Sequence, residues 1–160
     1  MGMVTGMKDG KSKEATFWRR VGSWLPKLFA EERFDVIRVE AEVVEDICAL
    51  AQGSHPKEMV AFLTGDIKEE GGVKVLVIDG LYVKGYDASG YSTSFTTHDL
   101  PLTGVYGTVH SHPGWSNRPS EADRRLFGKQ GWFHLIICEP YTRASIVAYG
   151  KQGEPIDVDF

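Results

Sequence analysis

The chain lacks the features that mark secreted, membrane-spanning and nucleic-acid-binding proteins. Its 160 residues include only two cysteines, Cys48 and Cys138, and neither belongs to a CxxC or zinc-ribbon spacing, which argues against a disulfide scaffold or a cysteine-rich metal site. No hydrophobic run approaches the ~20 residues of a transmembrane helix, and the polar N-terminus lacks the apolar core of a secretory signal. The net charge of −4 argues against nucleic acid as the main partner. We therefore expect a cytoplasmic protein whose two cysteines are buried free thiols, with a disulfide between them as the alternative.

Charge is distributed unevenly along the chain. Residues 1–34 carry seven Lys/Arg against four Asp/Glu, whereas residues 35–160 carry eleven against eighteen. We predict an N-terminal extension over residues 1–34 that begins with a disordered tail, and one domain over residues 35–160 that can bury a sizeable core. Residues 17–30 (FWRRVGSWLPKLFA) place apolar side chains in a helical stripe that Pro26 interrupts. We expect this stripe to pack on its own domain or on a second copy in a homodimer. The alternatives are that it binds a partner protein or lies on a membrane surface.

Hydrophobic periodicity in residues 35–160 predicts strands interspersed with two helices. The expected strands cover residues 34–39, 59–65, 73–83, 102–109, 133–138 and 144–149, with a last edge strand at 156–160, and the expected helices cover residues 41–51 and 120–129. An acidic turn with two glycines joins the second and third strands. This order predicts the α+β fold class, with a mixed β-sheet sandwiched by helices.

The segment HSHPGWSNRPSEAD, from His110 to Asp123, fits the pattern H-x-H-x7-S-x-x-D. Residues two apart in a strand point to the same face, so His110 and His112 project together at the end of the apolar strand before them. The following Pro- and Gly-containing loop ends at Ser120, which begins a helix that carries Asp123 in its first turn. Two imidazoles and one carboxylate suit Zn²⁺ and leave a fourth position open, which is the arrangement of catalytic zinc sites.

Each part of this pattern also has an ordinary structural interpretation. An H-x-H pair occurs by chance, and Ser120 with Asp123 forms a common helix capping box. The combination on a strand, a loop and a helix start favours the metal site.

The segment resembles the motif of the JAMM, or MPN+, metalloproteases. The family's upstream pattern P-x-E-x-x-x-x-L-x-G is matched by residues 56–65 (PKEMVAFLTG), and Glu58 takes the place of its glutamate. The resemblance covers about residues 36–160 and is closest to the compact archaeal members, which include deubiquitinase-like and desampylase-like isopeptidases. The Gly-Thr-Val before His110 departs from the more frequent Gly-Trp-Tyr without affecting a ligand. The resemblance implies the cytidine-deaminase-like MPN/JAMM fold.

The resemblance also implies a role for each matching residue. His110, His112 and Asp123 hold zinc, Glu58 acts as general acid and base, and Ser120 hydrogen-bonds the oxyanion. The implied activity is a zinc metalloprotease, an isopeptidase that removes ubiquitin-like modifiers with Gly-Gly tails, of the SAMP type, from protein lysines. One alternative is a JAMM peptidase that trims a sulfur-carrier protein in cysteine or cofactor biosynthesis, and another is a non-catalytic MPN scaffold.

Four further aromatic or imidazole side chains have both a functional and a structural interpretation. Trp115 lies in the loop next to the histidines, where it contacts the substrate's C-terminal tail or covers the core. His55, His98 and His134 are expected to be surface or hydrogen-bonded histidines rather than metal ligands.

Overall fold

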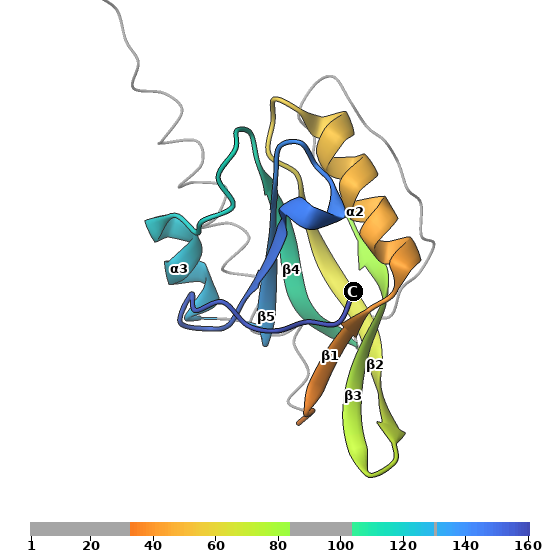
Figure 1. Ribbon diagram of the computed structural model, residues 1–160. Helices are drawn as coiled ribbons and strands as arrows, with labels where there is room; N and C mark the ends of the chain where they lie inside the picture. Colours follow the sequence, from red (N-terminus) through yellow and green to blue (C-terminus); the bar gives the residue numbers. More distant parts are fainter. Residues whose placement is uncertain (1–32, 84–103, 130) are drawn as a thin grey trace, which may run out of the picture.

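A six-stranded mixed sheet forms the centre of the computed structural model, which describes residues 33–83, 104–129 and 131–160 (Figure 1). Its strands are β1 (Val36–Val39), β2 (Val60–Glu70), β3 (Val73–Tyr82), β4 (Val105–His112), β5 (Phe133–Cys138) and β6 (Ile146–Tyr149). They lie in the order β1-β3-β2-β4-β5-β6. The pairs β1·β3 and β4·β5 are parallel, and the other neighbours are antiparallel. Strand β4, which carries both histidines of the motif, is therefore a central strand.

Two helices lie on opposite faces of this sheet. Helix α2 (Ala41–Ser54) buries Val43, Val44, Ile47 and Ala51 in the larger core, together with Phe133, Leu135 and Ile137 of β5. Helix α3 (Glu121–Phe127) buries Leu126 and Phe127 in a smaller core that contains Ile136 of β5. Because alternate residues of a strand face opposite sides, these two sets from β5 define the two faces. The α+β sandwich predicted from the sequence is confirmed.

Several element boundaries differ from the predicted ones. Strand β2 continues to Glu70, beyond the predicted end at residue 65, because its polar second half pairs with β3 up to the Gly71–Gly72 turn. Strand β4 includes His112, whereas the apolar pattern predicted an end at residue 109. The predicted strand at 144–149 begins instead as a 3-10 turn, Arg143–Ser145, which is followed by the shorter β6.

The C-terminal segment pairs with both outer strands of the sheet. Pro155 forms a bridge with Tyr149 of β6, and Asp159 forms one with Arg38 of β1. Between these bridges, Ile156 and Val158 pack against the α2-side core, as does the terminal Phe160. The predicted edge strand at 156–160 is therefore reduced to a single bridge beside β1.

Other predictions from the sequence can be placed on this fold. Cys48 in α2 is half-buried and Cys138 in β5 is buried, and both are free thiols. Residues 1–32 of the predicted extension 1–34, including the stripe at 17–30, lie outside the described residues, as does His98. The division at residue 34 therefore stays a prediction. None of the helices in the described ranges has the length and apolar character needed to cross a bilayer.

Candidate metal centre

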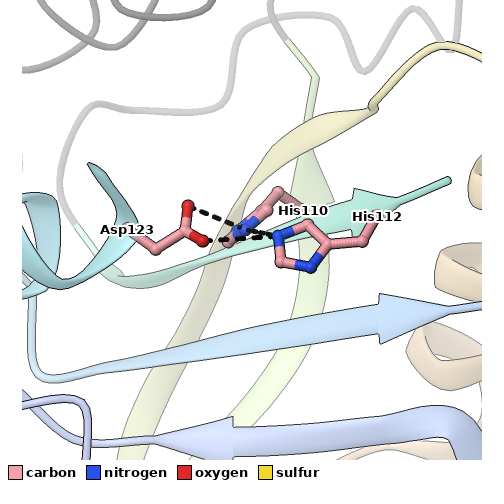
Figure 2. A group of neighbouring side chains, drawn as sticks. All are labelled: His110, His112 and Asp123. Carbon is pink, nitrogen blue, oxygen red and sulfur yellow. Dashed lines mark hydrogen bonds and ion pairs between the residues drawn. The ribbon is translucent and has the colours of Figure 1, made fainter. Parts of the chain in front are cut away.

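Three side chains of the motif converge where the end of β4 meets the start of α3 (Figure 2). The Nε2 atoms of His110 and His112 lie 3.0 Å apart. Asp123 places Oδ1 3.1 Å from Nε2 of His110 and Oδ2 3.3 Å from Nε2 of His112. His110 is 0% exposed and Asp123 is 1% exposed, whereas His112 is half-buried. The sequence predicted this group of three, and the structure brings it together.

The spacing of these atoms fits a small cation with tetrahedral ligands. Zinc bonds of about 2.0–2.2 Å put neighbouring ligand atoms about 3.3–3.6 Å apart. The three side chains form a triangle whose contacts are slightly shorter than or equal to that spacing: 3.0 Å between the two Nε2 atoms, and 3.1 and 3.3 Å from these nitrogens to the two carboxylate oxygens of Asp123. Two imidazole nitrogens and a carboxylate oxygen also form a donor set that zinc accepts, with one position left for another ligand.

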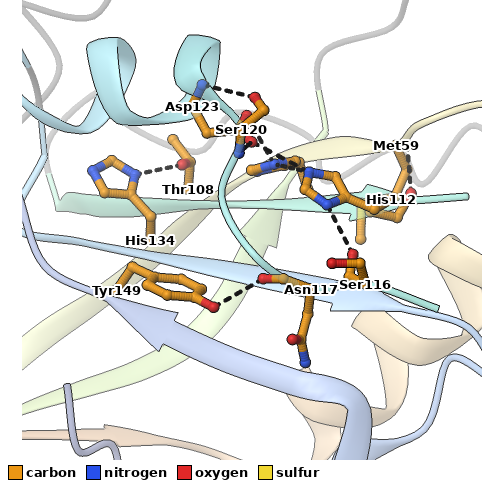
Figure 3. A network of polar contacts seen from close by, with 11 residues as sticks. Met59, Thr108, His112, Ser116, Asn117, Ser120, Asp123, His134 and Tyr149 are labelled. Atoms are coloured by element: carbon orange, nitrogen blue, oxygen red, sulfur yellow. Dashed lines mark hydrogen bonds and ion pairs between the residues drawn. The ribbon is translucent and has the colours of Figure 1, made fainter. Parts of the chain in front are cut away.

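Neighbouring groups orient two of the three side chains (Figure 3). Nδ1 of His112 lies 3.1 Å from the carbonyl oxygen of Ser116. Because a carbonyl only accepts, this contact requires the proton on Nδ1, so a neutral His112 has the lone pair of Nε2 available for a metal. The backbone N–H of Ser120 donates to Oδ2 of Asp123 at 2.6 Å, and the N–H of Asp123 donates to Oγ of Ser120. The capping box that starts α3 thus also fixes the carboxylate.

The charges of the site favour an ionised carboxylate. Burial disfavours the charged form of Asp123, but hydrogen bonds from His110, His112 and Ser120 outweigh it and hold its pKa well below the usual range. Burial also opposes protonation of His112, yet the hydrogen bond and charge of Asp123, with the charge of Glu58, raise its pKa overall. Asp123 therefore keeps the negative charge that a metal cation would neutralise.

Glu58 and Ser120, the two residues given catalytic roles by the resemblance, lie just before β2 and just before α3. Glu58 is exposed, and its charge contributes to the raised pKa of His112. Ser120 is the N-cap of α3, and its hydroxyl oxygen accepts the N–H of Asp123. A hydroxyl that accepts one hydrogen bond keeps its own proton to donate. Both positions are compatible with the implied roles.

The loop between His112 and Ser120 is held to the sheet on both sides of Trp115. Gly114 accepts a hydrogen bond from the N–H of Glu139, and the carbonyl of Asn117 accepts one from the hydroxyl of Tyr149. The side chain of Trp115 is nevertheless exposed, with 78% of the residue accessible, so it does not cover the core. Its proposed contact with substrate stays a prediction.

Two other histidines have structural partners. Nδ1 of His55 lies 2.8 Å from the hydroxyl of Tyr141. His134 is fully buried, contacts the hydroxyl of Thr108 at 2.7 Å, and stacks on Phe127 at a ring separation of 4.1 Å. Both agree with the prediction of satisfied rather than ligating histidines.

Comparisons with known proteins agree on one family. A family model described as prokaryotic homologs of the JAB domain matches residues 40–149. A Haloferax volcanii protein described as a probable metalloprotease is 30% identical over 129 residues, which cover 78% of this chain and 80% of that protein. A solved structure of a JAB1/MPN domain protein from Archaeoglobus fulgidus is 31% identical with a TM-score of 0.56, over 78% of this chain and 97% of that one. Another, described as a JAMM metalloprotease-like zinc site in the proteasome and signalosome, is 31% identical with a TM-score of 0.55, over the same shares of the two chains.

Proposed function

The chain belongs to the prokaryotic JAB-domain family of JAMM/MPN proteins, and from that premise we propose that it is a zinc-dependent metalloprotease that cleaves isopeptide bonds. The triangle of His110, His112 and Asp123 carries this proposal, because its nitrogen and carboxylate oxygen atoms converge at distances near those between the ligands of a tetrahedral metal. Bound zinc would supply a Lewis acid that lowers the pKa of water to about 7.

The residues around the triangle supply the proton transfers and the oxyanion contact. Glu58 takes a proton from the attacking water and delivers it to the leaving amine. Ser120 donates a hydrogen bond from its hydroxyl to the oxygen that becomes negatively charged in the tetrahedral intermediate. The exposed position of Glu58 and the remaining donor of Ser120 support these roles.

We propose a ubiquitin-like or sulfur-carrier-like protein with a C-terminal Gly-Gly as the substrate, released from a lysine side chain. Glycines let a polypeptide backbone approach a metal closely. Trp115 supports this choice, because an exposed indole on a loop fixed by hydrogen bonds offers a rigid apolar surface next to the site.

The test is cleavage of a small ubiquitin-like protein joined through its Gly-Gly to a lysine side chain. We expect cleavage with zinc, none with a chelator, and none by Glu58→Gln with its zinc retained. Glu121→Gln is the matched control, since this exposed carboxylate pairs with Arg125 instead of facing the triangle, and it should cleave normally.

Two outcomes would replace the proposal. Cleavage of a linear peptide after Gly-Gly, without cleavage of the isopeptide, would favour trimming of a sulfur-carrier protein. A protein that binds no zinc and cleaves neither substrate would be a non-catalytic scaffold.

A further inference from the structure

Ser111, between the two motif histidines, contacts the segment that carries Glu58. The residue is buried, with 1% of its surface exposed. Its N–H donates to the carbonyl of Met59 at 3.0 Å, and its hydroxyl oxygen accepts the N–H of Met59 at 2.8 Å. Figure 3 marks the second bond at Met59.

This pair of bonds replaces an ordinary step of the sheet ladder. In an antiparallel pair, two opposite residues can exchange both backbone hydrogen bonds. The ladder between β2 and β4 ends at Val60 and His110. One position further on, the Ser111 hydroxyl takes the place of a backbone acceptor for Met59, so the attachment depends on this side chain.

Glu58 is the next residue before Met59, and its backbone is held on both sides. The N–H of Lys57, on the other side, donates to the carbonyl of Ser54 at the end of α2 at 2.8 Å. The segment with Glu58 is therefore fixed between α2 and the strand that carries the two histidines.

We propose that Ser111 is a positioning residue that sets the place of Glu58 relative to the metal ligands. The inference rests on the proposed function, in which Glu58 transfers protons. Strand alternation points the Ser111 side chain away from the face of His110 and His112. Loss of its hydroxyl should therefore leave the metal ligands in place while the glutamate moves.

The test compares Ser111→Ala and Ser111→Cys, which remove or weaken the acceptor, with Ser111→Thr, which keeps it. We expect Ser111→Ala and Ser111→Cys to lower kcat about 10- to 100-fold with KM unchanged, because a small misplacement of a catalytic group has effects of that order. In these two variants, zinc affinity should not change and hydrogen exchange of the Met59 amide should become faster. Ser111→Thr should keep the wild-type kcat and the slow exchange of this amide.

Ser145→Ala is the matched control. Ser145 is also buried and its hydroxyl accepts a backbone N–H, that of Thr142, at 3.0 Å. It should keep the wild-type kcat. Wild-type kcat in both Ser111→Ala and Ser111→Cys, or an equal loss in Ser145→Ala, would overturn the proposal. If the wild-type protein cleaves nothing, the proposed function fails, and unchanged Met59 exchange in Ser111→Ala would separately refute the attachment.

Discussion

The two faces of the sheet differ in what they bury. The α2 face buries hydrophobic side chains from α2 and from every strand, and its core is the larger of the two. The α3 face combines a small apolar cluster with buried polar groups, among them His110, Asp123 and His134. Buried polar groups are costly unless they are hydrogen-bonded, and Asp123 and His134 have such partners. One face therefore supplies most of the apolar stabilisation, and the other carries the proposed metal site.

Asp123→Ala tests this division with the largest expected effect. It removes a proposed ligand and the acceptor of the Ser120 N–H, so zinc affinity and activity should both fall by at least about a thousandfold, in line with the loss of a whole catalytic metal site. Zinc content and turnover measure this. Unchanged zinc affinity would remove Asp123 from the ligand set.

Leu63→Ala tests the opposite face. Leu63 is fully buried in the α2-side core, and truncation should lower the free energy of unfolding by about 2–5 kcal/mol. Activity per folded molecule should stay near the wild-type value. Denaturant unfolding with active-site titration measures both, and a selective loss of activity would contradict the division.

Acid should release the metal from the α3 face. Protonated imidazole cannot bind zinc, and the pKa of His112 is raised from its ordinary 6.5 because the effects of Asp123 and Glu58 outweigh burial. As the pH is lowered, zinc affinity should therefore begin to fall while the pH is still above 6.5, and it should continue to fall at lower pH. A competition titration from about pH 8 to about pH 4.5 measures this, and a flat profile would exclude histidine ligands.

Trp115→Ala should have the smallest effect. Because the side chain is exposed, unfolding should change little, while KM should rise by about 5- to 10-fold, as for a modest interface contact. Steady-state kinetics on the isopeptide substrate measures this. An unchanged KM would show that Trp115 does not contact the substrate.

The sequence predicted the metal triangle better than it predicted the surrounding supports. His110, His112 and Asp123 follow from local spacing on a strand and a helix start, which a single sequence displays. The attachment of Met59 by Ser111 joins residues 52 positions apart, and alternation alone gave only the direction of the serine. The second half of β2 was missed because its polar residues lack an apolar pattern, although pairing with β3 stabilises it.

The two bridges of the C-terminal segment have a consequence for the shape of the sheet. Pro155 and Asp159 lie outside opposite edges, and the four residue steps between them span at most about 14 Å. In a flat sheet, about seven strand spacings would separate these positions by about 34 Å. The sheet must therefore curve so that its outer strands, β1 and β6, come closer together. The curved sheet partly surrounds the α2-side core. The same C-terminal segment covers part of the outer edges of β1 and β6, at positions where another strand would otherwise pair.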